Sequence, residues 1–254
     1  EYLHLNWEIS WPWLILGHQF GHTPRLIQWY EYTGVLGGSL WVLIINFLLF
    51  EWWIQRGGQS RQRLLVPALF LGIPLLYSMI RFYTYQPCGE QAEVVVLQPN
   101  YNPHYAKDTV PQPEQLQQYL KLTNETVTDS TRWLLLPESA FRGVNVRRLM
   151  SHQAISTYSK WGDEHPQAAT IMGVSAIERW LKEKPTNTHA LREYKRDSGS
   201  KFWYKAYNAA VFMKNNEQPE LYKKSRFVPG AEITPYPEVF FFIKPLTDAL
   251  GGTM

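Results

Sequence analysis

The stretch Arg132–Phe141 reads RWLLLPESAF. Its apolar run, which ends at Pro137, predicts a buried strand that stops abruptly, because proline cannot donate to the next rung of a ladder. Glu138 is then the first residue beyond the strand. Ligand sites gather at the carboxyl ends of strands in open α/β sheets, so Glu138 is a candidate general base whose pKa apolar surroundings would raise. The alternative is a helix N-terminus capped by Glu138 or Ser139.

Strands and helices alternate on both sides of this stretch, from about residue 92 to residue 254. Gly173 lies in one expected strand and marks a close backbone approach or a bulge. Early alternation followed by consecutive strands fits a layered α/β sandwich better than a purely parallel sheet. The other expected strands are 93–98, 169–177, 205–214 and 221–228, and the expected helices are 111–124 and about 146–161.

Residues 1–86 differ in character and predict a membrane part. Two apolar segments, at about 33–54 and 64–83, are each about as long as a bilayer core requires, so we expect two transmembrane helices. The first 32 residues are rich in tryptophan and tyrosine, which suits an aromatic belt at the membrane interface. We interpret them as an arm on the outer face.

The short loop between these two segments sets the expected orientation. It contains Arg56, Arg61 and Arg63 and no acidic residue. By the positive-inside rule this loop faces the cytoplasm. The N-terminal arm and everything after the second helix would then lie on the opposite, outer side.

Composition argues against several other functions. The net charge of +3 is too small to indicate nucleic-acid binding. The one cysteine, Cys88, excludes an internal disulfide framework, and with no histidine or basic group placed to activate it we interpret it as structural. His18 and His22 have the spacing of metal ligands, but Gly17 and Gly21 disfavour a helix there and no third ligand is apparent. We therefore expect no metal site.

A second charged motif, Tyr222–Glu232, reads YKKSRFVPGAE. Its lysine pair precedes a strand that ends at Val228-Pro229, which repeats the arrangement around Glu138. An ammonium group near Glu138 would keep that carboxylate ionised and could hold the oxyanion of a tetrahedral intermediate. Glu232 adds a second acid. Taken alone, the motif also fits a solvated turn.

The segments follow one another in a specific order: two apolar helices, a strand ending in QPN, WLLLPESAF, a glycine-bearing strand, a YN strand and YKKSRFVPGAE. This order resembles the apolipoprotein N-acyltransferase family, bacterial membrane enzymes with a nitrilase-like (carbon-nitrogen hydrolase) domain. WPWLILGHQF and IQWYEYTGVLG also resemble its membrane part. The resemblance implies transmembrane α-helices in residues 1–86, followed in residues 92–254 by part of an α/β nitrilase-like four-layer sandwich. We interpret the chain as a fragment that lacks both termini.

The resemblance also implies a glutamate, a lysine and a cysteine at the active site. Glu138 matches the glutamate that takes the thiol proton, and Lys224 matches the lysine because it lies four residues before Val228. Glu232 matches a second glutamate that supports the site, and Asn208 matches a substrate-binding position near it. The nucleophilic cysteine belongs to a later element of the family, so we expect these 254 residues alone to be inactive.

The implied reaction transfers an acyl chain from a phospholipid to the α-amino group of a lipoprotein's diacylglyceryl-modified N-terminal cysteine, through a thioester acyl-enzyme. It needs neither a metal nor another cofactor. We expect a monomer in the bacterial cytoplasmic (inner) membrane, with its catalytic domain on the periplasmic face and no nucleic-acid partner. Two alternatives remain open: a membrane-anchored amidase or acyltransferase with another acceptor, and a non-catalytic nitrilase-like protein that binds lipid or a partner.

Overall fold

The chain divides into two compact units, one formed by Glu1–Gly89 with Pro235–Val239 and the other by Glu90–Thr234 with Phe240–Met254. The arginine-rich loop that sets the expected orientation, residues 55–63, lies outside the described residues. The computed structural model describes residues 1–54, 64–101, 110–180, 192–195, 201–230, 232–233, 235–236, 238–240 and 242.

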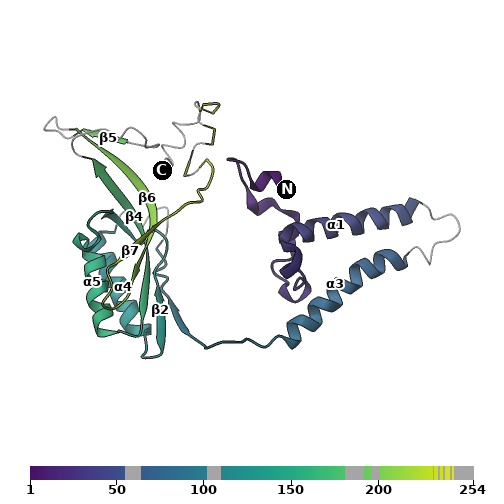
Figure 1. Cartoon of the computed structure of the whole chain (residues 1–254), viewed down its shortest axis with the longest axis horizontal. Coiled ribbons are helices and arrows are strands. Elements are labelled where there is room, and N and C mark those ends of the chain that lie inside the picture. The colour runs from purple at the N-terminus through teal and green to yellow at the C-terminus, as the bar shows by residue number, and fades with distance from the viewer. Residues whose placement is uncertain are drawn as a thin grey trace. The chain divides into compact units, whose positions relative to one another are not determined.

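The first unit contains two long apolar helices, α1 (Tyr30–Ile54) and α3 (Leu65–Thr84) (Figure 1). Both are long and apolar enough to cross a membrane, and only 11% of the apolar window of each is buried. A core helix of a soluble domain would bury an apolar stripe, so this exposure supports a membrane environment. Gly34, with φ of 64°, interrupts α1 near its start.

Proline inside α3 leaves one backbone carbonyl without its helical hydrogen bond, and a side chain of α1 supplies the missing donor. Pro74 has no backbone N–H, so the carbonyl of Phe70 lacks its usual partner within the helix. The indole Nε1 of Trp41 on α1 donates to that carbonyl oxygen at 2.7 Å. Satisfying a freed backbone group from a neighbouring helix is how membrane helices tolerate proline.

Four short 3-10 turns precede α1 in the first unit. The backbone N–H of Gly17 donates to Ser39 Oγ on α1 at 2.9 Å, which joins the N-terminal arm to the helix. The turns are η1 (Leu3–Leu5), η2 (Pro12–Leu14), η3 (Leu16–Phe20) and η4 (Pro24–Leu26).

The second unit is built on one mixed sheet, in the strand order β1-β2-β4-β6-β5, with β3 pairing beside β4 and β7 beside β6. The pairs β1–β2, β2–β4 and β3–β4 are parallel, and the pairs of β6 with β4, β5 and β7 are antiparallel. The strands are β1 (Glu93–Val96), β2 (Thr131–Leu135), β3 (Phe141–Asn145), β4 (Ala169–Trp180), β5 (Arg192–Lys195), β6 (Lys201–Met213) and β7 (Glu220–Lys223).

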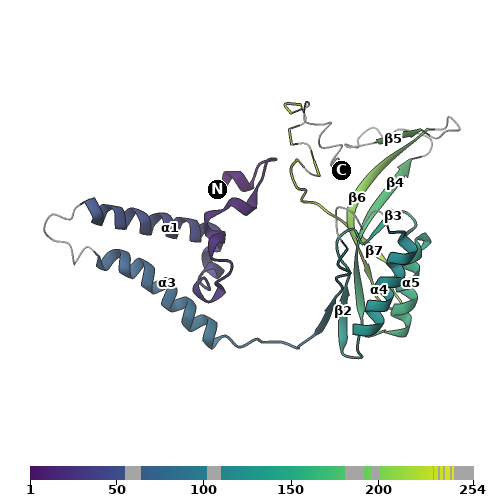
Figure 2. The same ribbon diagram turned by 180° about the vertical axis from the view of Figure 1, so that it is seen from behind.

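Helices α4 (Gln112–Thr126) and α5 (Gln153–Glu164) cover one face of this sheet (Figure 1, Figure 2). The core between helices and sheet contains the fully buried side chains of Leu134, Tyr158 and Val174. The prediction of two apolar helices followed by a mixed α/β domain is therefore confirmed.

The opposite face of the sheet has no helix on it among the described residues. Because strand side chains alternate, Trp133 points to this face while Leu134 points to the core. Val94, Val96 and Tyr222 are likewise exposed on it. This face is thus apolar and open to solvent in the described part of the chain.

The helix predicted at about 146–161 was wrong in its first part. Residues 149–151 form the 3-10 turn η5 (Leu149–Ser151), and regular helix begins only at Gln153. Strand β3, directly before this segment, was not predicted. A register shift lies between Arg142 and Val144, around Gly143, whose φ is 80°. The bulge points Phe141 and Val144 to the same core although they are three residues apart. That spacing is typical of a helix and not of the alternation that indicates a strand, which explains why β3 was not predicted.

Candidate active site

Glu138 lies at a break between two strands that share one neighbour. β2 and β3 both pair with β4, and the residues between them leave the sheet for one short turn. Leu136 N donates to Ile171 O before the turn, and Ala140 N donates to Gly173 O after it, each at 2.8 Å. The turn therefore projects the side chain of Glu138 while its ends stay fixed to β4.

The turn lies directly on Gly173, as the sequence predicted for a close backbone approach. A Cβ atom at Gly173 would lie 2.3 Å from Pro137 O and 2.6 Å from Glu138 Cα. Real Cβ atoms do not approach backbone atoms so closely, so only glycine allows this path. Ser139 completes the turn with φ of 52°, an uncommon conformation for a residue other than glycine.

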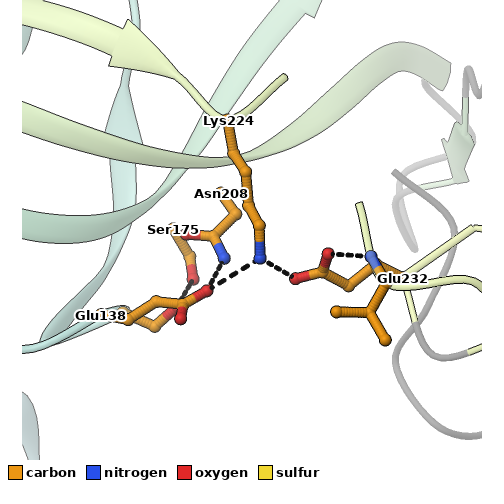
Figure 3. Close-up of polar contacts among 7 residues, drawn as sticks. Glu138, Ser175, Asn208, Lys224 and Glu232 are labelled. Atoms are coloured by element: carbon orange, nitrogen blue, oxygen red, sulfur yellow. Dashed lines mark hydrogen bonds and ion pairs between the residues drawn. The ribbon is translucent and has the colours of Figure 1, made fainter. Parts of the chain in front are cut away.

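Lys224 reaches this turn from the end of β7. Its backbone N–H donates to Asn208 O at 2.8 Å, which continues the β6–β7 ladder by one step. Its Nζ lies 2.6 Å from Glu232 Oε1 and 3.4 Å from Glu138 Oε1 (Figure 3). One ammonium group therefore bridges the two carboxylates that the sequence motifs singled out.

Glu232 is held by its own turn. Its Oε2 accepts a hydrogen bond from Val228 N at 2.7 Å, while its Oε1 accepts the ammonium of Lys224. Burial acts to lower the pKa of Lys224, but the hydrogen bond that Lys224 donates to Glu232 and the charges of Glu138 and Glu232 outweigh it, so the pKa is raised. Lys224 is therefore a fixed cation at neutral pH.

Asn208 on β6 also contacts Glu138. Its amide Nδ2 donates to Glu138 Oε1, the same oxygen that faces Lys224 (Figure 3). Ser175, which pairs with Asn208 across β4 and β6, donates its hydroxyl to Ser139 Oγ at 3.4 Å. Ser175 was not predicted from the sequence to belong to the site. Its position two residues after Gly173, on the same face of the strand, is the signal that could have revealed it.

A cavity of about 510 Å³ opens beside these groups. Within it the Glu138 side chain is 63% exposed and the Lys224 side chain 30% exposed. The expectation that apolar surroundings bury Glu138 was wrong, because the turn points its side chain away from the helix-covered core. Glu138 therefore faces open space where a reactant can reach it. The lining residues are Leu136, Glu138, Ile171, Gly173, Asn208, Ala209, Ala210, Tyr222, Lys224, Ser225 and Arg226.

Three further candidates from the sequence lie outside this cluster. Cys88 is exposed and belongs to the first unit. His18 and His22 also belong to the first unit, in and after η3. Across the part of the chain that the structure describes, no three histidine, cysteine, aspartate or glutamate side chains are arranged to hold a metal ion.

Two comparisons with known proteins agree with the resemblance seen in the sequence. The profile of the apolipoprotein N-acyltransferase N-terminal domain matches residues 1–48. An apolipoprotein N-acyltransferase of Chlorobaculum tepidum is 24% identical over 267 residues, an alignment that covers 99% of this chain and 47% of the relative. The chain thus spans about half the length of that relative. Both matches are to apolipoprotein N-acyltransferases, so the chain is similar to this family in its first 48 residues by the profile and along 99% of its length by the relative.

Proposed function

We propose that the protein containing this chain transfers an acyl chain from a phospholipid to the α-amino group of a lipoprotein's diacylglyceryl-modified N-terminal cysteine. One observation carries the proposal. A solvent-accessible carboxylate, Glu138, shares a cavity with a lysine that a second carboxylate fixes in place. Nucleophilic acyl transfer needs a base that deprotonates the nucleophile and a positive group that stabilises the oxyanion, and Glu138 and Lys224 can supply these.

In the first half-reaction, Glu138 takes the proton of a cysteine thiol and the thiolate attacks the ester carbonyl of the phospholipid. Lys224 and backbone N–H groups stabilise the oxyanion of the tetrahedral intermediate. The carbon–oxygen bond to the glycerol then breaks, the proton on Glu138 goes to the departing alkoxide, and a lysophospholipid leaves. The enzyme retains the acyl chain as a thioester.

In the second half-reaction, the neutral α-amino group of the lipoprotein attacks the thioester carbonyl. Glu138 takes a proton from the amine and the carbon–sulfur bond breaks. That proton then returns to the departing thiolate, which leaves the amide product and a regenerated thiol. One carboxylate serves both steps because each transfers a single proton to and from the same position.

The cysteine nucleophile is supplied from outside this chain in the proposal. Cys88, the chain's one cysteine, belongs to the unit of the apolar helices, whereas Glu138 and Lys224 belong to the unit of the sheet. Because the chain spans about half the length of its relative, the proposal assigns the nucleophile to the rest of the protein, and we expect acyl transfer by the full-length protein and none by the 254 residues alone.

The finer fold belongs to the same proposal. A four-layer nitrilase-like sandwich places a second sheet and its helices against the first sheet. The exposed apolar face that carries Val94, Val96, Trp133 and Tyr222 supports such a partner layer, since an apolar sheet face is stable when another layer covers it. Asn208 is assigned to substrate positioning, because it borders the cavity beside Glu138.

The proposed location is the bacterial inner membrane with the sheet unit on the periplasmic face. Cys88 offers a direct test because it is exposed and follows α3. A membrane-impermeant maleimide added to spheroplasts should label Cys88 of the 254-residue chain without lysis. Labelling only after lysis would place this end of α3 in the cytoplasm and contradict the proposal.

The reaction is tested by incubating the full-length protein with phospholipid and a diacylglyceryl-modified lipopeptide in detergent. Mass spectrometry should show the lipopeptide gaining one acyl chain as an amide, with lysophospholipid formed in equal amount. A lipopeptide whose α-amino group is already acetylated is the matched control and should gain nothing. Acyl transfer to a different amine but not to the lipopeptide would instead support an enzyme with another acceptor.

A further inference from the structure

A second charge cluster lies on β4, on the face opposite to the cavity. Its centre is Glu178, whose side chain is 17% exposed. The carboxylate accepts a hydrogen bond from Tyr207 Oη at 3.0 Å and lies 3.4 Å from Lys223 Nζ and 3.3 Å from an Arg147 guanidinium nitrogen. Tyr207 and Lys223 lie in the YN strand and the YKKSRFVPGAE motif, but the sequence assigned no role at the candidate site to either of them, to Glu178 or to Arg147.

Two of these partners are the immediate neighbours of site residues. Tyr207 precedes Asn208 on β6, and Lys223 precedes Lys224 at the end of β7. Successive side chains of a strand point to opposite faces. Contacts that hold one side chain on one face therefore also restrict the orientation of the next side chain on the other face. Glu178 binds Tyr207 and Lys223 on the helix-covered face. These contacts restrain the backbone of the next residues, Asn208 and Lys224, whose side chains point to the other face.

Such a hold is needed because β7 is short. It has four residues and pairs with β6, and its last paired residue is Lys223, opposite Ala209. The end of a short strand at the edge of a sheet opens readily. Lys223 Nζ also lies 4.0 Å from the centre of the Tyr207 ring, a cation–π contact that joins the two strands again.

The charge state of Glu178 is consistent with this role. Burial acts to raise its pKa, but the hydrogen bond from Tyr207, the charge of Lys223 and the hydrogen bonds from Lys223 and Arg147 outweigh burial, so the pKa is lowered. The carboxylate is therefore ionised at neutral pH and attracts the ammonium of Lys223.

We propose that Glu178 is a positioning residue. By holding Tyr207 and Lys223, its carboxylate fixes Asn208 and Lys224 against Glu138. The effect on catalysis rests on the proposed function, whereas the effect on the position of Lys224 does not. Arg147 contacts the same carboxylate, but its chain neighbours are not among the residues that line the cavity beside Glu138, so we assign it no part in positioning Asn208 and Lys224.

The position of Lys224 is read from the titration of its amine in the full chain. Competitive acetylation with isotope-labelled anhydride, from about pH 8 to about pH 12, gives the reactivity of each lysine by mass spectrometry. Near its two carboxylates Lys224 should titrate above its ordinary value of 10.5. In Tyr207→Phe and Lys223→Met, Lys224 moves away from them and its pKa should fall toward that value.

These variants separate position from charge. Tyr207→Phe changes no charge at neutral pH, and Lys223→Met removes a nearby cation, which by charge alone raises the pKa of Lys224. A fall in both variants therefore reports movement. Arg147→Met also removes a cation from Glu178 and should cause no fall, and Lys223→Arg should restore the wild-type titration. If Lys223→Met does not fold, Tyr207→Phe, which loses one hydroxyl, still decides.

Activity provides the second measurement. In the full-length protein, Tyr207→Phe and Lys223→Met should lower kcat about tenfold with KM within about twofold, since misplacement of a catalytic group by 1 Å costs roughly a hundredfold. An unchanged Lys224 titration in both variants, or an equal fall in Arg147→Met, would overturn the proposal. If the wild-type full-length protein shows no acyl transfer, the proposed function is wrong. The acetylation experiment alone then tests whether Glu178 positions Lys224.

Discussion

Two adjacent lysines of this chain have opposite surroundings. Lys223 points to the helix-covered face and pairs with Glu178, whose carboxylate has three polar partners and is mostly buried. Lys224 points to the other face, where it bridges Glu138 and Glu232 beside a cavity of about 510 Å³. Both residues are lysines, and their surroundings differ because their side chains point to opposite faces of the sheet.

The difference between the two clusters shows that one face of the sheet can hold positioning residues while the other face holds the candidate catalytic residues. The Glu178 carboxylate has three protein partners and is only 17% exposed, although the Lys223 and Arg147 side chains that pair with it reach solvent. Glu138 also has protein partners, yet its side chain is 63% exposed and borders the cavity. A carboxylate can act as a base only when a reactant reaches it, which is the case for Glu138.

The largest expected effect follows from replacing the accessible carboxylate. Glu138→Gln keeps the size of the side chain and removes the base, so acyl transfer by the full-length protein should fall by about a hundred- to ten-thousandfold. Glu217→Gln is the control, because Glu217 pairs with Lys214 on the surface away from the cavity. Wild-type rates in Glu138→Gln, measured with the lipopeptide assay, would remove Glu138 from the mechanism.

The two lysines should differ in the size of their effect. Lys224→Met removes a group placed for oxyanion stabilisation and should lower kcat by about a hundred- to a thousandfold. Lys223→Met acts only through position, and its loss should be about tenfold. Equal losses of kcat in the two variants would contradict the assignment of oxyanion stabilisation to Lys224 and of positioning to Lys223.

Substituting the glycine beneath Glu138 should disturb the cavity face selectively. Gly173→Ala forces a Cβ against Pro137 O and Glu138 Cα, which should cost about 1–3 kcal/mol and displace the turn. Hydrogen exchange should then show lost protection at Ala140, whose N–H bonds to Gly173 O.

Gly162 on α5 supplies the matched control for this prediction. A Cβ there meets no atom within 4 Å, so Gly162→Ala should stabilise the helix by up to about 1 kcal/mol. Unchanged exchange at Ala140 in Gly173→Ala would contradict the close approach.

The smallest effects concern pH, and the two clusters should respond at opposite ends of the scale. The pKa of Glu178 is lowered on folding, so its contribution to stability is present above its ordinary value of 4.5 and is lost as pH falls below it. The raised pKa of Lys224 gives a contribution that is complete below 10.5 and lost as pH rises above it.

Both contributions are partly exposed to solvent and should be about 1 kcal/mol or less. They are measured as the difference in unfolding free energy between wild type and Glu178→Gln in acid, and between wild type and Lys224→Met in alkali. A Glu178 contribution that survives full acidification, or a Lys224 contribution that disappears already at neutral pH, would contradict the assigned charge states.

Local patterns in the sequence predicted most elements of the fold. Continuous apolar runs indicated α1 and α3, and the run ending at Pro137 indicated β2. They failed at β3, where the bulge at Gly143 gave strand residues the spacing of a helix. β5 was also missed.

The sequence by itself determined which residues carry charge next to strand ends: Glu138 after its proline stop, and Lys224 and Glu232 around Val228-Pro229. It determined this because strand ends and proline stops are local properties. The tertiary structure alone decided that these three groups meet, since they lie up to 94 residues apart, from Glu138 to Glu232, and only the pairing of β4, β6 and β7 joins them. It also decided that Lys224 faces the cavity and Lys223 does not, because the face of each side chain is fixed by register against β6.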